Sequence, residues 1–111
     1  MKIVRTRRYL KDMQRIGATD RDIIRLEETI ASNPTAGDVV PGLAGIRKLR
    51  FALAGRGKRG GGRAIYFLMV SDDVAVMVFA YSKAAQEDLT ADQRKAAIAV
   101  LKELTDEQER N

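Results

Sequence analysis

Residues 46–81 read IRKLRFALAGRGKRGGGRAIYFLMVSDDVAVMVFAY, and this stretch decides the fold. Its first part, Ile46–Ala54, alternates between apolar and other side chains, which is the period of a half-buried strand. Arg63–Val70 and Val74–Tyr81 are continuous apolar runs of strand length, and Ser71-Asp72-Asp73 between them is a turn signal. The stretch therefore predicts three consecutive strands that form an antiparallel meander.

The segments before this meander predict a strand and two helices. Lys2–Arg5 is a short strand candidate, and Arg7–Ile16 places apolar residues three or four positions apart, as an amphipathic helix does. Thr19 is a favourable N-cap for a second helix, which Ser32-Asn33-Pro34 ends. Val39-Val40 then predicts a short extended piece.

After the meander, Thr90-Ala91-Asp92-Gln93 matches a capping box at the start of a last helix. We expect this helix over residues 91–106, with a polar tail at residues 107–111. The elements predict an α+β fold, a small curved antiparallel sheet with an N-terminal helical hairpin and a C-terminal helix packed on it. The chain is expected to be a single domain over residues 1–111, with its helices on one face of the sheet and its cations on the other.

The composition excludes several classes of site. The 111 residues contain no Cys and no His, so disulfides, zinc fingers, cysteine nucleophiles and Ser-His-Asp triads are impossible. Acid–base chemistry must then use Lys, Arg, Tyr, Asp or Glu, and no metal or cofactor is expected. The longest apolar runs are too short to span a bilayer, and no signal peptide follows Met1. We therefore expect a soluble cytoplasmic protein without a membrane partner.

Cations concentrate in one window of the chain. Val39–Ser71 is 33 residues long and contains no Asp or Glu but seven Lys and Arg residues. The window carries a charge of +7 while the whole chain has a net charge of +5, so the rest of the chain sums to −2. Cations without counter-charges among them repel one another, and a bound polyanion relieves that repulsion. One surface is thus predicted to bind something negative.

The basic centre of this window, Gly55–Arg63, allows several interpretations. Its Gly-x-Gly-x-x-Gly spacing matches a dinucleotide-binding fingerprint, but it leads into a strand instead of a helix. A phosphate-cradling nucleotide loop is disfavoured because no Ser or Thr follows Lys58. A solvated hairpin loop would account for the glycines and the cations. Because Lys48, Arg50 and Arg63 extend the charge onto the strands, phosphate-backbone binding is favoured, with DNA, RNA and an acidic protein all open.

Four segments together carry a family resemblance: Gly45–Arg50, Gly55–Tyr66, Tyr81–Lys83 and Glu87–Thr90. With the order of elements along nearly the whole chain, they resemble the HigB branch of the RelE/ParE toxin superfamily. The resemblance implies a toxin of a type II toxin–antitoxin pair, whose RelE-like relatives cut mRNA in the ribosomal A site without metal. There the 2′-hydroxyl of one nucleotide attacks its own 3′-phosphate, which gives a cyclic phosphate and a free 5′-hydroxyl. The implied partners are the ribosome with its mRNA and a cognate antitoxin of the helix-turn-helix type, through which alone operator DNA would be reached.

The resemblance also implies site residues. Arg63 matches the family's catalytic arginine at the start of Arg-x-Ile-Tyr, Lys58 lies in the loop that supplies lysines near the attacking hydroxyl, and Lys83 matches a basic position after the last sheet strand. Arginine can grip two phosphate oxygens, and cations stabilise the crowded charge of the phosphorane. The residues implied to bind RNA are Lys48, Arg50, Arg56, Arg59 and Tyr66. Tyr66 would stack on a base or contact phosphate, although a tyrosine in an apolar strand usually packs in the core.

Two positions depart from the family's pattern. RelE carries an arginine directly after the lysine that corresponds to Lys83, and a base-stacking tyrosine near its C-terminus, whereas this chain has Ala84 and Thr90. Glu87 and Asp88 are nearby carboxylates that either cap the next helix or take part in catalysis. Two other functions stay open: a ParE-like poison of DNA gyrase, and a catalytically inactive nucleic-acid-binding or protein-binding module.

Overall fold

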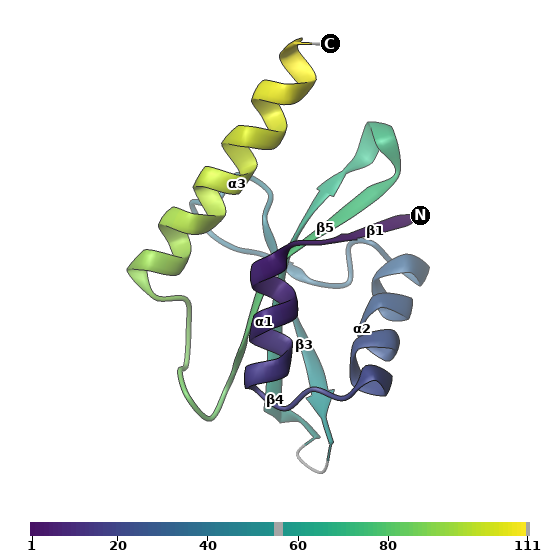
Figure 1. Ribbon diagram of the computed structural model, residues 1–111, viewed down its shortest axis with the longest axis vertical. Coiled ribbons are helices and arrows are strands. Elements are labelled where there is room, and N and C mark those ends of the chain that lie inside the picture. The colour runs from purple at the N-terminus through teal and green to yellow at the C-terminus, as the bar shows by residue number, and fades with distance from the viewer. Residues whose placement is uncertain (55–56, 111) are drawn as a thin grey trace.

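A central sheet carries helices from both ends of the chain (Figure 1). This computed structural model describes residues 1–54 and 57–110, and it describes the side chains of residues 1–54, 61–69 and 71–104. The elements are β1 (Lys2–Arg5), α1 (Arg7–Arg15), α2 (Asp20–Ser32), β2 (Asp38–Val39), β3 (Arg47–Leu53), β4 (Gly57–Met69), the 3₁₀ turn η1 (Val70–Asp72), β5 (Val74–Ser82) and α3 (Ala91–Arg110). The predicted α+β architecture, with two N-terminal helices and one C-terminal helix, is confirmed.

The described strands lie in the sheet order β1-β5-β4-β3-β2. β3, β4 and β5 form the predicted antiparallel meander, and β2 adds to it antiparallel to β3. β1 pairs with β5 in parallel, a partnership that the sequence pattern did not predict. The sheet is therefore mostly antiparallel, with one parallel pair at its β1 edge.

The glycine-rich segment is strand over most of its described length. β4 begins at Gly57, which pairs with Leu53, and not at Arg63 as predicted. Gly62 pairs with Phe51, and a Cβ atom at Gly62 would overlap the Phe51 ring. Glycine inside a strand often marks such a close approach. At Gly62 the missing side chain therefore serves packing and not a turn.

The helices α2 and α3 begin at the predicted side-chain caps. Thr19 forms a capping box with Asp22 at the start of α2, and Thr90 exchanges the same pair of hydrogen bonds with Gln93 at the start of α3. α3 continues through the predicted polar tail to Arg110, because this tail is rich in strong helix formers and contains no Gly or Pro. Within the described part of the chain, no helix is both long enough and apolar enough to cross a membrane.

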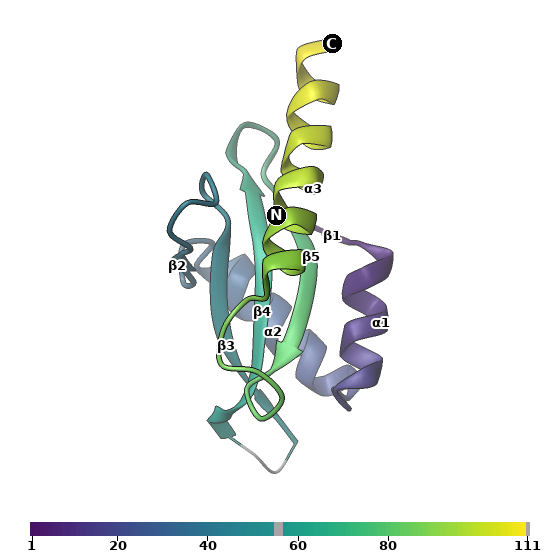
Figure 2. The same cartoon turned by 90° about the vertical axis from the view of Figure 1, so that its left-hand side faces the viewer.

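Helices cover both faces of the sheet. Figure 2 shows α3 in front of the strands and α2 behind them. The core of the α1/α2 face consists of Tyr9, Met13, Leu26, Ile30, Phe51, Leu53, Ala64, Tyr66, Ala75, Met77 and Ala80. The core of the α3 face consists of Val40, Leu43, Ile46, Ile65, Val78, Phe79, Tyr81, Leu89 and Ala97. The expectation that all helices lie on one face was wrong, because the continuous apolar runs of β4 and β5 present apolar side chains to both faces.

Candidate active site

A row of polar side chains crosses three strands on the α3 face. Arg50 of β3 pairs with Arg63 of β4, and Arg63 pairs with Tyr81 of β5. Residues that are directly opposite in neighbouring strands lie on the same face of the sheet, and like charges in this position destabilise it. The row therefore puts two guanidinium groups and a phenol side by side, at a cost to the free protein.

Arg63 is the buried member of the arginine pair. The residue is only 5% exposed, and its guanidinium donates a hydrogen bond to the Gly62 carbonyl at 3.0 Å. Burial lowers the pKa of Arg63, and the positive charge of Arg50 lowers it further. Arginine starts from so high a pKa that it stays charged. A bound anion would therefore relieve both the repulsion and the desolvation at Arg63.

Tyr81 completes the row, although it was not among the site residues that the resemblance implied. Its hydroxyl is the one buried side-chain polar atom among the described residues that has no hydrogen-bond partner. Burial raises the pKa of Tyr81, as does Asp88, while Arg63 and Arg94 act in the opposite direction. The net rise keeps the phenol protonated at neutral pH, so it can donate a hydrogen bond. Its position opposite Arg63 depends on strand register, which no local sequence signal reports.

Lys83 lies directly after β5, next to this row. Its backbone N–H donates to the Gly61 carbonyl at 2.9 Å, which fixes the chain beside the strand that carries Arg63. Its Nζ lies 3.5 Å from the backbone carbonyl of Glu87. The backbone of Lys83 therefore lies beside β4, while its side chain extends toward Glu87, and a site shared with Arg63 stays a prediction.

Lys48 and Arg50 line a cleft of about 570 Å³ between β3 and the start of α3. Asp88 enters this cleft and accepts hydrogen bonds from Lys48 Nζ at 3.3 Å and from the Leu89 N–H at 2.7 Å. Arg94 Nη2 is 3.8 Å from the other Asp88 oxygen. The Leu89 N–H lowers the pKa of Asp88 most, burial opposes this, and Lys48 and Arg94 lower it further. Asp88 thus pairs with cations of the predicted RNA surface. Arg94 joins that surface from α3, a helix that was predicted but was not expected to contribute to RNA binding.

The structure does not place every predicted site residue in this cluster. Arg56 and the side chains of Lys58 and Arg59 lie outside the described residues. Tyr66 is fully buried on the opposite, α1/α2 face, which contradicts its prediction as an RNA contact. Its hydroxyl donates to the Pro34 carbonyl at 2.8 Å and accepts from the Gly37 N–H at 3.0 Å. The side chain is committed to the core because both hydrogen-bonding roles of its oxygen are already used.

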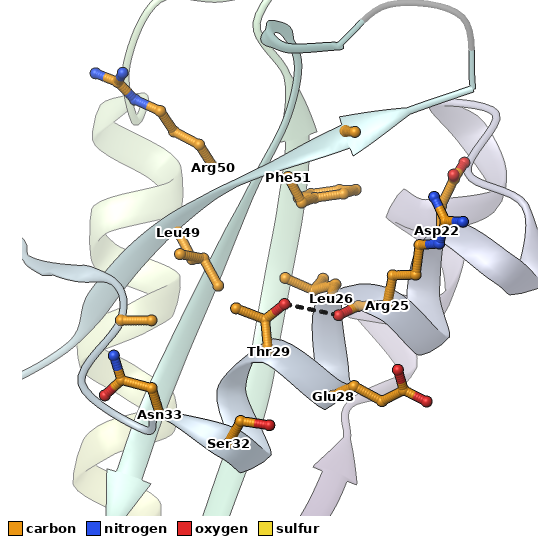
Figure 3. Close-up of a pocket in the computed structure, with 12 residues that line it drawn as sticks. Asp22, Arg25, Leu26, Glu28, Thr29, Ser32, Asn33, Leu49, Arg50 and Phe51 are labelled. Carbon is orange, nitrogen blue, oxygen red and sulfur yellow. Dashed lines mark hydrogen bonds between the residues drawn. The ribbon is translucent and has the colours of Figure 1, made fainter.

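A groove between α2 and β3 lacks the features of a phosphate site (Figure 3). It measures about 660 Å³ and lies on the α1/α2 side. Figure 3 shows Leu49 and Phe51 pointing toward α2, while Arg50 points to the other side of β3. Asp22 and Glu28 line the groove together with Arg25 and Arg50, so the described lining has as many carboxylates as cations and no excess of positive charge. No group of three acidic side chains that could hold a metal ion occurs among the residues described.

Comparison with known proteins identifies the family. Residues 1–111 match the sequence model of the RelE toxin of the RelE/RelB toxin–antitoxin system. A solved structure of a mutant of the E. coli toxin RelE in the free state is similar, with a TM-score of 0.55 and 19% sequence identity over 78% of this chain and 86% of that chain. At this identity the structural likeness supports the fold alone, whereas the sequence match spans the whole chain. The protein therefore belongs to the RelE family, the toxins of RelE/RelB toxin–antitoxin systems.

Proposed function

We propose that this toxin is a ribosome-dependent mRNA endonuclease of the HigB-like branch, which cleaves by 2′-hydroxyl attack on the adjacent phosphate without a metal ion. RelE family toxins are typically ribosome-dependent mRNA endonucleases, which makes this the first activity to consider. The proposal also includes a cytoplasmic location and inhibition of translation until an antitoxin binds.

The observation that carries the proposal is the row Arg50–Arg63–Tyr81 on the α3 face. Attack by the 2′-hydroxyl concentrates negative charge on a pentacoordinate phosphorus, and fixed cations stabilise such charge best where water is excluded. Arg63 is buried and can grip two phosphate oxygens with its planar fork. Tyr81 adds a neutral donor beside it. The site thus supplies the charge stabilisation that metal-free phosphate transfer needs at the transition state.

The remaining residues take roles around Arg63. Lys83 adjoins the row and contributes positive charge to the scissile phosphate, and Lys58 is assigned to the attacking hydroxyl by resemblance to the family. Lys48 and Arg50 hold the RNA backbone on the described surface, and Arg56 and Arg59 are proposed to do the same. The antitoxin, of helix-turn-helix type, would silence the toxin by covering this basic surface, and operator DNA would be reached only through their complex.

In vitro translation with primer extension tests the proposal. Wild-type protein should produce new 5′ ends within translated mRNA, and Arg63→Ala should slow their appearance about 100-fold or more, the scale of losing one transition-state donor. Arg63→Lys keeps the charge without the fork and should fall between the two. Arg25→Ala removes an exposed cation from α2 and is the matched control, expected to cut like wild type. Thermal melts would verify that every variant is folded.

Three outcomes would contradict the proposal. No new 5′ ends at saturating wild-type protein would refute endonuclease activity, and gyrase-dependent DNA damage in cells with intact mRNA would favour the ParE-like function. Growth inhibition that survives Arg63→Ala, Lys58→Ala and Lys83→Ala together would favour a catalytically inactive binding module.

A further inference from the structure

The Asp88 carboxylate lies in a setting that suits a phosphate. One of its oxygens accepts from Lys48 Nζ at 3.3 Å and from the Leu89 N–H at 2.7 Å, and the other lies 3.8 Å from Arg94 Nη2. Two cations and a backbone N–H are also the donors that bind phosphate oxygens in nucleic-acid complexes. The geometry therefore describes an anion subsite whose present occupant comes from the chain itself.

The charges of the surrounding cleft favour exchange of that occupant. Lys48, Arg50 and Arg94 line the cleft together with two carboxylates, Asp38 and Asp88. With Asp88 in place the three cations exceed the carboxylates by one charge, and without it they exceed them by two. The Asp88 side chain is 56% exposed, and those of Lys48 and Arg94 are 31% and 38% exposed. Exposed ion pairs are weak, so an incoming phosphate can displace the carboxylate at little cost.

The subsite is continuous with the row of Arg50, Arg63 and Tyr81. Lys48 and Arg50 are two residues apart on β3, so their side chains lie on the same face about 7 Å apart along the strand. Arg50 in turn lies opposite Arg63, which lies opposite Tyr81 on the next strand. One strand of RNA can therefore meet Arg63 with one phosphate and Lys48 with a neighbouring one.

We propose that Lys48, Arg94 and the Leu89 N–H form a binding subsite for a backbone phosphate of single-stranded RNA, and that Asp88 occupies this subsite in the free protein as a competing carboxylate. The inference rests on the proposed function for its choice of RNA. It adds Arg94 to the RNA-binding surface and makes Asp88 an internal competitor that weakens RNA binding. RNA binds when one of its phosphates displaces the Asp88 carboxylate from these donors.

RNA binding measured without ribosomes tests the subsite. The probe is a fluorescent single-stranded RNA with 2′-O-methyl groups, which cannot be cleaved, and the readout is fluorescence anisotropy across a salt series. Asp88→Asn keeps an acceptor for the Leu89 N–H and should tighten binding about twofold to fivefold, the range of an exposed ion pair. Arg94→Ala should weaken binding and reduce the slope of log K against log salt by about 0.7, the contribution of one phosphate contact.

Matched variants separate the subsite from a general effect of charge. Asp92→Asn makes the same charge change in the first turn of α3 and should leave the affinity nearly unchanged. Lys95→Ala is the corresponding control for Arg94→Ala, since Lys95 is exposed on the same helix. The increase in RNA affinity caused by Asp88→Asn should be smaller in a Lys48→Ala, Arg94→Ala background, because the two cations for which Asp88 and RNA compete are gone.

Three results would overturn the subsite. The first is that Asp92→Asn and Asp88→Asn tighten RNA binding equally. The second is that Asp88→Asn raises the RNA affinity as much in the double-alanine background as in the wild type. The third is that Asp88→Asn binds a polyglutamate peptide more tightly but does not change its affinity for RNA. The cleavage assay is independent of all three. Selective tightening by Asp88→Asn in a protein that never cuts mRNA would keep the subsite and refute the endonuclease.

Discussion

The two faces of the sheet treat a buried tyrosine differently. On the α1/α2 face, the Tyr66 hydroxyl donates to the Pro34 carbonyl at 2.8 Å and accepts from the Gly37 N–H at 3.0 Å. On the α3 face, the Tyr81 hydroxyl is also buried but has no hydrogen-bond partner in the described part of the chain. A buried tyrosine hydroxyl usually finds a partner, so Tyr66 follows the rule and Tyr81 breaks it.

The charged groups on the two faces also differ in their neighbours. Glu27, on the α1/α2 side, accepts hydrogen bonds from Arg5 at 2.7 Å and from the Tyr9 hydroxyl at 2.9 Å. Arg63, on the α3 face, lies opposite a second arginine, Arg50. Groups that are matched within the protein stabilise the fold, whereas like charges and a spare donor gain most from an external anion. One face of the sheet therefore serves folding, and the other carries the candidate chemistry.

The largest expected effect breaks the matched face. Glu27→Ala removes the acceptor of the buried Tyr9 hydroxyl and leaves Arg5 without its carboxylate. Loss of one partner in a partly buried network should lower the free energy of unfolding by about 2–4 kcal/mol, measured by chemical denaturation. Glu28→Ala changes an exposed neighbour on α2 and should stay within about 0.5 kcal/mol of wild type. Equal losses in the two variants would contradict the network's role.

A smaller loss is expected where the two faces meet on β4. Gly62 supports the α1/α2 core, and its neighbour Arg63 belongs to the α3 face. Gly62→Ala forces a methyl group into the Phe51 ring and should cost about 1–3 kcal/mol of stability. Adding Phe51→Leu should remove part of that penalty in a double-mutant cycle. Purely additive losses would show that the two side chains do not compete for space.

Local patterns predicted the elements, and the site needed more than local patterns. The alternation of Ile46–Ala54 and the capping residue Thr19 predicted a strand and a helix start correctly, because period and cap act within a few residues. The meeting of Lys48 with Asp88 spans 40 residues of sequence, and it depends on the path of the segment between β5 and α3. Tyr66 shows the same limit, since the general preference of such tyrosines for the core did not tell which face of the sheet it would occupy. Register and loop path are tertiary properties that one sequence does not display.

The next smaller effect is expected for the two buried tyrosines, whose substitution tests directly whether the two faces differ. Tyr66→Phe leaves the Gly37 N–H and the Pro34 carbonyl without their partner and should cost about 1–2 kcal/mol in denaturant unfolding. Tyr81→Phe breaks no hydrogen bond among the described residues and should change stability by less than about 0.5 kcal/mol. Removal of the Tyr81 hydroxyl should instead lower the rate of mRNA cleavage during in vitro translation. If Tyr81→Phe destabilises as much as Tyr66→Phe, the two faces do not differ as described.

The smallest expected effect is in the acid dependence of stability. The Leu89 N–H lowers the pKa of Asp88 most, and at Asp22 the hydrogen bonds from Thr19 and Ala54 outweigh burial and lower the pKa. A carboxyl whose pKa is lower in the folded state stabilises the fold above its unfolded pKa of about 3.9, and this contribution is lost as pH falls through the folded value. Stability should therefore fall as pH drops below about 5, and Asp22→Asn and Asp88→Asn should each flatten this fall. At pH 7, Asp22→Asn should cost more than Asp88→Asn, because Asp22 receives backbone hydrogen bonds from two elements whereas Asp88 competes for cations that an RNA would use. Thermal melts across this pH range measure both slopes, and an unchanged slope in either variant would show that the carboxyl concerned is not held in its charged form by the fold.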